Sequence, residues 1–507
     1  MPRLPRFAST LVAAALLALL GWGPGCGGGQ KGSGFASGAG DGTGNGGTGS
    51  GDDGGAGGNG TSGGFNLGGA SSGGGGPVAC PSGLECDVTC SGTTTSISGK
   101  VYDPAGRNPL YNIVVYVPAS SLKPLDRGVP TGADACNCPA LYKSGAVVIT
   151  TTAVDGTFKL TNAPVGTNVP LVVQVGKWRK LFHIDVSSCK DNPQPDKSLR
   201  LPSSVPAGDT NDNMPDIAVS TGSADTLECL MSRIGLPASE YVAGAGGSGH
   251  IHVFAGGASG FAGLFSGAGS AETPGMSGAP ASPTSLWQSQ SQLMPYDIVL
   301  LSCEGGETYQ ANPPALEAYL NVGGRVFASH FHYAWFAGPL SSGQGYAAPA
   351  DWGSHLAAWS AGSNGGTGGN SPLGGTIVQT LNGSSQAFAK GVALDKWLGV
   401  VNALGQNGVP AGELSIYQPR FNASVTASNT PSQPWITSGS STMYFSFDTP
   451  INPPKGKDGT PLYCGRAVFS DLHVGGDPST SDTMSPQGGC SAGPLSPQEK
   501  ALEFMLF

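Results

Sequence analysis

Two pairs of histidines are the clearest candidates for metal binding in this sequence. In each pair, one residue separates the two histidines. They are His250 with His252 and His330 with His332. Residues two apart in a β-strand face the same side, and two imidazoles on one side suit a transition metal ion such as zinc. Ligand sites in open α/β sheets lie at the carboxyl ends of strands. The sequence therefore favours the pair that follows a strand, His330 and His332, over the pair that begins one.

A third histidine and three carboxylates follow other expected strands. His473 follows the expected strand 467–471. We therefore predict a metal site with the ligands His330, His332 and His473, and with candidate carboxylates at the same edge, Glu304, Glu307 and Asp471. An ion with an open coordination position could activate water for hydrolysis. No HExxH motif is present, so packing of the histidines among the aromatic residues of 331–336 is the alternative, and no catalytic residue is assigned.

Strands and helices that alternate from residue 204 to 507 are expected to position these side chains. Apolar runs predict strands at 217–220, 251–254, 297–302, 325–329 and 467–471. Helical spacing and capping residues predict a helix at 226–234, one capped by Asn312 and one that opens with the capping box Ser496 to Glu499. This alternation is typical of an α/β domain with a mostly parallel sheet covered on both faces.

Three segments of this region carry a resemblance: YDIVLLSCEGGE, LEAYLNVGGRVFASHFH and GRAVFSDLH. They resemble the class I glutamine amidotransferase-like fold, a flavodoxin-like architecture, and in particular its ThuA-like branch, where a histidine follows the strand after the two glycines. An amidotransferase needs a cysteine on the tight turn where this chain has Ser329 and His330. The family's triad therefore does not carry over, and Cys303, which follows another strand, is expected to be paired or buried.

Residues 96–203 have a different pattern, with short β-branched runs and turn residues between them. Strands are predicted at 97–102, 112–117, 147–152, 158–160, 170–175 and 180–186, which indicates an all-β sandwich. The segments SISGKVYDPAGRNPLYNIVVYVP and TTTAVDGTFKLTNAPVG resemble the carboxypeptidase regulatory-like domain, a prealbumin-like sandwich. The resemblance implies a non-catalytic accessory domain with a fold related to carbohydrate-binding ones. Tyr111 and Trp178 could stack on sugar rings, but packing is favoured for both.

The first 78 residues are typical of an exported, tethered protein. Residues 1–25 have two early arginines and a 14-residue apolar core, too short to span a bilayer. They resemble a bacterial lipoprotein signal that ends before an acylated Cys26, although Gly23 stands where such signals usually carry leucine. A plain secretory signal is the alternative. Residues 26–78 are glycine-rich and are expected to be a disordered tether.

The remaining ten cysteines are an even number, which in an exported chain predicts up to five disulfides. Three lie in a cysteine-rich segment, residues 79–95. Cys136 and Cys138 are expected to pair with Cys189 or with this segment, and Cys464 with Cys490. A zinc knuckle is the rival interpretation. The disulfide candidates are Cys80, Cys86, Cys90, Cys136, Cys138, Cys189, Cys464 and Cys490.

Composition limits the partners and the location. The chain has 507 residues, a formal net charge of −9 and no basic run, which argues against nucleic acid as a partner. We expect a lipid-anchored protein of the cell envelope, on the outer membrane or cell surface, with a non-catalytic binding role toward a glycan or another envelope component. The alternatives are a metal-assisted hydrolase that acts on carbohydrate or cell-wall material in the α/β domain, and a purely structural module.

Overall fold

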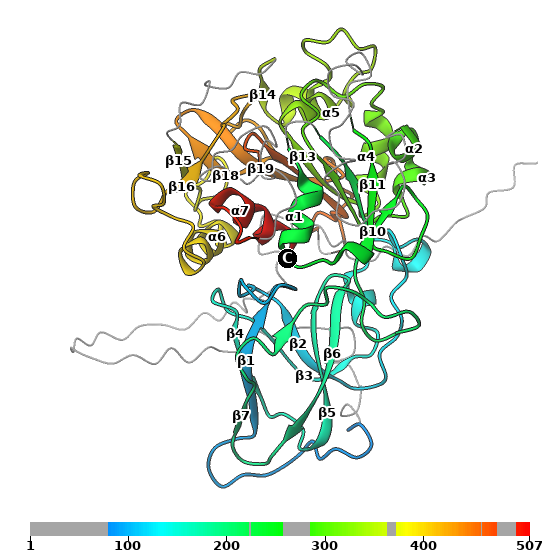
Figure 1. Cartoon of the computed structure of the whole chain (residues 1–507), viewed down its shortest axis with the longest axis vertical. Coiled ribbons are helices and arrows are strands. Elements are labelled where there is room, and N and C mark those ends of the chain that lie inside the picture. The colour runs from blue at the N-terminus through cyan, green and yellow to red at the C-terminus, as the bar shows by residue number, and fades with distance from the viewer. Residues whose placement is uncertain (1–79, 223–224, 257–283, 362–371, 458, 474–492) are drawn as a thin grey trace, which may run out of the picture.

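The computed structural model of the chain describes residues 80–222, 225–256, 284–361, 372–457, 459–473 and 493–507 (Figure 1). The predicted signal sequence and tether, with Cys26, and also Cys490 lie outside these residues. No helix in the described ranges is long and apolar enough to cross a membrane.

Two four-stranded sheets form the first part of the described chain (Figure 1). Their strands are β1 (Ser96–Tyr102), β2 (Val114–Pro118), β3 (Ala146–Thr151), β4 (Thr157–Thr161), β5 (Gly166–Val175), β6 (Trp178–Val186), β7 (Asp191–Pro193) and β8 (Leu199–Arg200). One sheet has the order β4-β1-β7 with β8 also on β1, and the other has the order β3-β2-β5-β6. Ile97 of β1 and Val115 of β2 share one core. All six predicted strands are present, with ends shifted by up to four residues.

A ten-stranded sheet forms the second part, in the order β10-β11-β9-β12-β13-β20-β19-β18-β15-β16. The strands are β9 (Ile217–Ser220), β10 (Tyr241–Ala243), β11 (Ile251–Phe254), β12 (Ile298–Leu301), β13 (Arg325–Ser329), β15 (Leu373–Ile377), β16 (Leu414–Ile416), β18 (Gln433–Ser438), β19 (Ser441–Thr449) and β20 (Gly465–Ser470). A separate two-stranded sheet pairs β14 (Ala358–Trp359) with β17 (Ala423–Ser424).

The large sheet is mixed, because five of its nine strand pairings are parallel and four are antiparallel. The strands from β10 to β20 in the sheet order pair in parallel, whereas β19, β18, β15 and β16 add antiparallel pairings. The five strands that the sequence predicts are all in the parallel part. The expectation of a mostly parallel sheet is therefore corrected to a mixed sheet, because residues 373–449 extend its edge with antiparallel strands.

Helices cover both faces of this sheet (Figure 1). They are α1 (Leu227–Arg233), α2 (Thr284–Trp287), α3 (Gln290–Leu293), α4 (Pro313–Asn321), α5 (Tyr333–Ala337), α6 (Ala389–Val400) and α7 (Pro497–Leu506). Helices α1, α6 and α7 pack with Val219 and Leu300 in one core, and α2 to α5 pack with Ala218 and Val299 in another. Adjacent strand residues thus point into opposite cores, as a sheet covered on both faces requires.

Both predicted helix caps are confirmed. The side chain of Asn312 accepts a hydrogen bond from Ala315 N at the start of α4. At the start of α7, Ser496 Oγ accepts from Glu499 N, and Glu499 Oε2 accepts from Ser496 N at 2.7 Å. The capping box fixes the first turn of α7, a helix that contacts the functional site described below.

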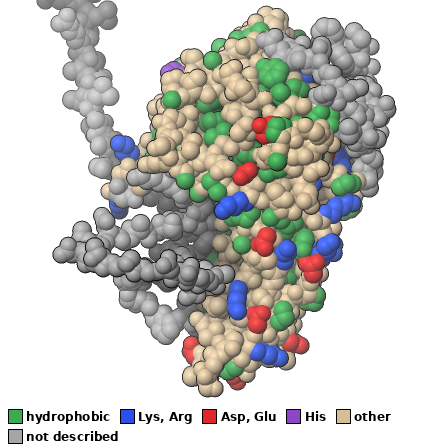
Figure 2. All heavy atoms as spheres, turned by 90° about the vertical axis from the view of Figure 1, so that its left-hand side faces the viewer, with side chains coloured by type: hydrophobic (Ala, Val, Ile, Leu, Met, Phe, Trp, Pro, Cys, Tyr) green, Lys and Arg blue, Asp and Glu red, His purple; other side chains and the backbone are tan. Residues whose placement is uncertain are grey.

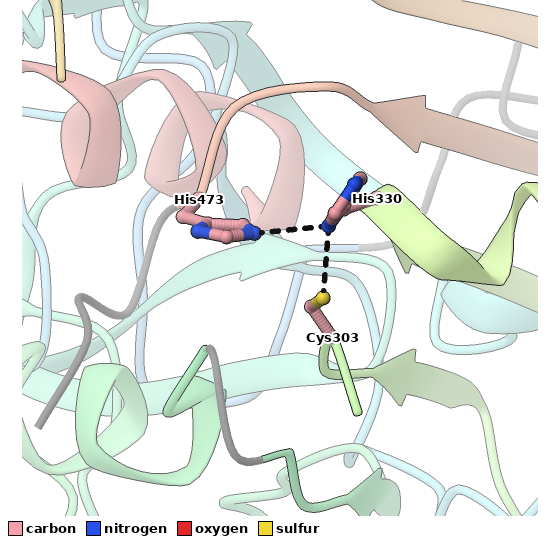
Figure 3. A group of neighbouring side chains, drawn as sticks. All are labelled: Cys303, His330 and His473. Carbon is pink, nitrogen blue, oxygen red and sulfur yellow. Dashed lines mark hydrogen bonds between the residues drawn. The ribbon is translucent and has the colours of Figure 1, made fainter. Parts of the chain in front are cut away.

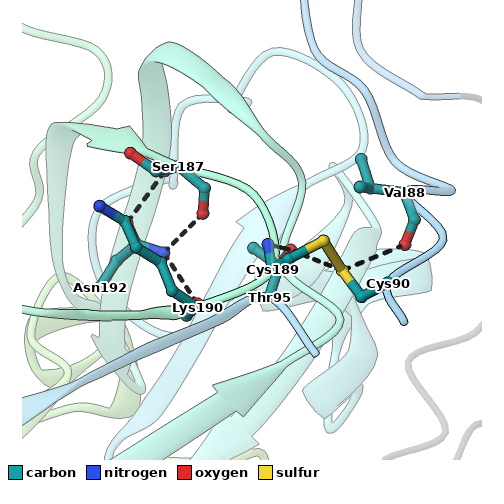
Figure 4. The surroundings of a disulfide bond; sticks show 7 residues. All are labelled: Val88, Cys90, Thr95, Ser187, Cys189, Lys190 and Asn192. Atoms are coloured by element: carbon teal, nitrogen blue, oxygen red, sulfur yellow. Dashed lines mark hydrogen bonds between the residues drawn. A yellow bond between two sulfur atoms is a disulfide. The ribbon is translucent and has the colours of Figure 1, made fainter. Parts of the chain in front are cut away.

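The disulfides differ from the predicted pairs. The structure has Cys80–Cys86, Cys90–Cys189 and Cys136–Cys464, and Figure 4 shows the surroundings of the second. Cys136 therefore does not pair with Cys189 or with residues 79–95, and Cys464 does not pair with Cys490. Cys136 pairs with Cys464 because the segment before Cys136 leaves the β-sandwich and lies against the large-sheet domain. In this segment, Val129 N donates a hydrogen bond to Met294 O of that domain.

Two further cysteine predictions have definite outcomes. Cys303 is buried and free, as one of the two expected alternatives states. Cys229 is disulfide-bonded, and nothing is described of the side chain of Cys138. The six cysteines that form the three described disulfides cannot be zinc ligands, so the zinc-knuckle interpretation is wrong for them.

Helix α7 joins the two parts of the molecule. Phe507 packs edge-on against Trp178 with ring centroids 5.3 Å apart, and Phe504 stacks on Tyr111 at 5.8 Å. These contacts confirm that Tyr111 and Trp178 are packing residues. Glu503 also reaches this interface, where its Oε2 accepts from Asn108 Nδ2 at 2.6 Å.

Replacement of Glu503 by glutamine is expected to flatten the dependence of stability on pH. Burial, and then the neighbouring Asp103, raise the pKa of Glu503 well above its ordinary value. The folded chain thus holds this proton more tightly than the unfolded chain. The stabilisation is complete below the unfolded pKa of about 4.3 and is lost as pH rises toward the folded pKa.

Urea unfolding at several pH values between 4 and 8 measures this effect. The wild-type chain should lose more stability with rising pH than Glu503→Gln, and the exposed Glu85→Gln should behave like wild type. Identical slopes for the wild-type and Glu503→Gln chains would contradict the expectation.

Candidate metal centre

Three side chains converge at the carboxyl ends of adjacent strands of the large sheet. Cys303 follows β12, His330 follows β13 and His473 follows β20. His330 Nδ1 lies 3.1 Å from Cys303 Sγ and 3.4 Å from His473 Nε2, as Figure 3 shows. All three residues are buried, and their three ligand atoms lie within 4.8 Å of one another. We call this group the Cys303 cluster.

Neighbouring backbone segments approach Cys303 closely. His330 has a φ of +46°, in the left-handed region, so the chain turns sharply where β13 ends. This turn brings the backbone N–H of Phe331 to the Cys303 sulfur, which the N–H of Gly305 also faces. On another side, a Cβ added to Gly222 would collide with the carbonyl oxygen of Cys303. Glycine is therefore required at position 222 for Cys303 to keep its place.

His332 does not belong to this group. The chain does not continue as a strand after Ser329 but forms a 3₁₀ turn over residues 330–332. His332 then points elsewhere: its Nε2 lies 2.7 Å from Ser302 O and its Nδ1 lies 2.8 Å from Thr308 Oγ1. The predicted ligand set is corrected accordingly, because the rule that residues two apart share a face holds only within a strand.

The candidate carboxylates have separate positions. Glu307 accepts hydrogen bonds from Tyr333 Oη and from the backbone N–H groups of 340–342. Burial alone would raise the pKa of Glu307, but these bonds outweigh it and lower the pKa to about 2. Glu307 therefore holds a loop. Glu304 is buried, and neither glutamate is among the three residues that converge.

Asp471 lies two residues before His473. Its Oδ2 accepts from Asn422 N at 2.7 Å and from Ala423 N at 2.8 Å. Burial raises the pKa of Asp471 to about 8, although these two N–H groups favour the charged form. Among the described residues, Asp471 Oδ1 has no hydrogen-bond partner.

Without a ligand, the Cys303 cluster is electrically neutral. Burial raises the pKa of Cys303 to about 12 and lowers that of His473 to about 3. Burial, and then the neighbouring His473, lower the pKa of His330 well below its usual value. Two buried ring nitrogens, His330 Nε2 and His473 Nδ1, have no hydrogen-bond partner among the described residues. Buried unsatisfied polar groups are unfavourable, and such groups call for a specific explanation.

The other histidine pair has a structural role. His250 Nδ1 lies 2.6 Å from Glu240 Oε2, and His252 Nδ1 lies 2.9 Å from Gly244 O. His252 Nε2 also lies 3.2 Å from Asp216 Oδ1. The contacts with Glu240 and Asp216 lie at the amino ends of β10 and β9, the edge opposite to the Cys303 cluster, whereas Gly244 follows the carboxyl end of β10.

Sequence reasoning missed Cys303 as a member of the site. The strand that precedes Cys303 was predicted, but not that β12 lies next to β13 in the sheet. A signal was present, because Cys303 and His330 each come within two residues of the end of an apolar strand. With the strand order known, both would be expected at one edge.

A thiolate and two imidazoles are a ligand set that zinc accepts. Zinc bonds of about 2.0–2.3 Å at tetrahedral angles place neighbouring ligand atoms roughly 3.3–3.7 Å apart. The two separations of 3.1 and 3.4 Å in the Cys303 cluster lie close to this range. The residues present therefore fit a transition metal ion with little rearrangement.

No known family model matches this sequence, and comparisons with curated proteins and with solved structures give no match.

Proposed function

We propose that the protein is an exported, lipid-anchored envelope protein that binds a transition metal ion, such as zinc, in the Cys303 cluster. The observation that carries the proposal is the convergence of three buried ligand atoms within 4.8 Å. Metal binding displaces the thiol proton and gives the Cys303 sulfur and the two nitrogens that face it, His330 Nδ1 and His473 Nε2, one shared partner, so the ion would stabilise the folded chain. Thiolate and imidazole also suit copper(I), and elemental analysis distinguishes these ions.

The envelope location rests on sequence features. The expected lipoprotein signal, acylation at Cys26 and the glycine-rich tether support a protein held on a membrane through lipid. Three disulfides in the described part of the chain are typical of an oxidising compartment. The resemblances to a carboxypeptidase regulatory-like domain and to a ThuA-like amidotransferase fold agree with such a protein, with a glycan or another envelope component as its partner.

A second candidate function is metal-assisted hydrolysis of carbohydrate or cell-wall material. One feature of the Cys303 cluster favours it: among the described residues, three ligands converge. Structural zinc sites have four protein ligands, whereas catalytic sites have three and leave one position for water or substrate. A metal-bound water is a nucleophile at neutral pH.

Metal content tests the proposal. We expect about one zinc or other transition ion per full-length chain exported to an oxidising compartment and purified without chelator. EDTA should lower the melting temperature. His330→Ala and Cys303→Ser should each weaken metal binding by more than a hundredfold, since loss of even an outer-shell partner weakens binding roughly 10–100-fold.

Two variants are matched controls. His183→Ala removes an exposed histidine of β6 and should retain the metal. His332→Ala should also retain it, because both ring nitrogens of His332 already have protein partners. A wild-type chain without metal and without response to EDTA would refute the proposal, and loss of metal in His332→Ala would restore the ligand set that the sequence predicts.

A further inference from the structure

Among the described residues, an arginine near the Cys303 cluster lacks a carboxylate partner. Arg420 is half-buried. Its Nη1 donates to the carbonyl oxygens of Gln418 and Pro419, at 3.0 and 3.1 Å. Its Nε is buried and has no hydrogen-bond partner among the described residues, where no carboxylate oxygen lies within 4.0 Å of the guanidinium. A half-buried charge of this kind is unfavourable unless an anion meets it.

The backbone fixes Arg420 beside the cluster. Arg420 N donates to Asp471 O at 2.7 Å, two residues before His473. The side chain of Gln498 in α7 then ties both segments together: its Nε2 donates to His473 O at 2.6 Å, and its Oε1 accepts from Tyr417 N at 2.7 Å. Helix α7 thus holds the arginine and a proposed metal ligand in one arrangement.

The charge of Arg420 reaches the members of the cluster. It acts on Cys303, His330 and His473, although burial is the larger influence on each of them. The guanidinium therefore lies close enough to these three side chains for its charge to act on them. Buried atoms without partners gather at this edge of the sheet among the described residues: Arg420 Nε, Asp471 Oδ1, His330 Nε2 and His473 Nδ1. Each such atom calls for an explanation, and for Arg420 Nε an anion supplies one.

We propose that the metal centre binds an oxyanion, a phosphate or a carboxylate, that Arg420 holds beside the ion. The inference rests on the proposed metal centre and adds the ligand class that it takes. Guanidinium groups match the planar, charged oxygens of such anions, and the anion would fill the coordination position that three protein ligands leave open. A substrate of this site would then carry a phosphate or carboxylate group.

Titration of the full-length, metal-loaded chain with inorganic phosphate and with acetate tests the proposal. Binding is followed by calorimetry and by the spectrum of the cobalt(II)-substituted chain. Arg420→Met should weaken the binding of the preferred anion roughly tenfold or more, since it removes a charge-assisted hydrogen bond. Arg420→Lys should retain part of it. The metal content should be unchanged in both variants, and Arg200→Met, at an exposed arginine, should bind as wild type does.

The outcomes separate this proposal from the one on which it rests. Preference for phosphate or for acetate identifies the anion. A metal-loaded wild-type chain that binds neither anion, or an Arg420→Met chain that binds as tightly as wild type, overturns the role of Arg420. A wild-type chain without metal refutes the metal centre, and anion titration of that chain with and without Arg420→Met still decides whether the arginine receives an anion.

Discussion

Replacement of Arg233 by methionine is expected to lower the free energy of unfolding by about 3–5 kcal/mol. Arg233 Nη2 bonds to Glu499 Oε1 between α1 and α7, and both side chains are only 1% exposed. Burial raises the pKa of Glu499, and the charge of Arg233 opposes this effect. Loss of the guanidinium leaves a carboxyl group buried without its cation, and only the hydrogen bonds with Ser496 then oppose its desolvation.

Chemical denaturation of single and double variants measures this pair. Arg233→Met with Glu499→Met should be more stable than Arg233→Met alone, because replacement of both partners leaves no unpaired buried charge. Lys143→Met, which breaks the exposed pair with Asp134, is the control and should change little. A loss no larger than that of the control would show that the pair between α1 and α7 does not stabilise the fold.

This ion pair also bears on the metal centre. Glu499 is adjacent to Gln498, whose side chain holds the backbone of His473. A displaced α7 would therefore move a proposed ligand, and we expect weaker metal binding in Arg233→Met than in wild type. The same helix packs Phe504 and Phe507 on the β-sandwich, so the two parts of the chain and the site share one support.

The sequence predicted the strands and helix caps that depend only on residues close together in the chain. The strands β9, β11, β12, β13 and β20 are solid apolar runs, and the caps at Asn312 and Ser496 each depend on a side chain close to its backbone partner. The antiparallel strands β15, β16, β18 and β19 were not predicted. They are stable because they extend an existing sheet, which is a tertiary effect that local propensity does not contain.

In the candidate site too, local sequence signals predicted some residues but not those that tertiary contacts bring together. His330 and His473 were predicted because each follows an apolar strand, and strand ends place ligands. His332 lies apart from the other two histidines because the chain leaves the strand after Ser329, where the φ of His330 is positive. Cys303 and Arg420 were missed because only the strand order and the bonds between residues 417–423 and Asp471 bring them to the same edge.

The disulfide Cys136–Cys464 is expected to be the most stabilising of the three described. It links residues 328 apart, whereas Cys80–Cys86 closes a separation of only 6. In the chain-entropy account, the longer loop restricts the unfolded chain more, by about 3.5 kcal/mol relative to the short one. The disulfide Cys90–Cys189 hardly shortens the loop that Cys136–Cys464 closes. The path along the chain from Cys136 to Cys464 that passes through Cys90–Cys189 is nearly as long as the direct one.

Paired serine variants test this expectation without leaving a reactive thiol. Removal of Cys136 and Cys464 together should lower the free energy of unfolding by roughly 3–5 kcal/mol. Removal of Cys80 and Cys86 should cost clearly less. The longer bond also anchors the segment that contains Val129, which bonds to Met294 O before α4, so its loss should expose this segment to proteolysis. Equal losses in the two paired variants would argue that the stabilisation comes from native contacts at each bond and not from the unfolded chain.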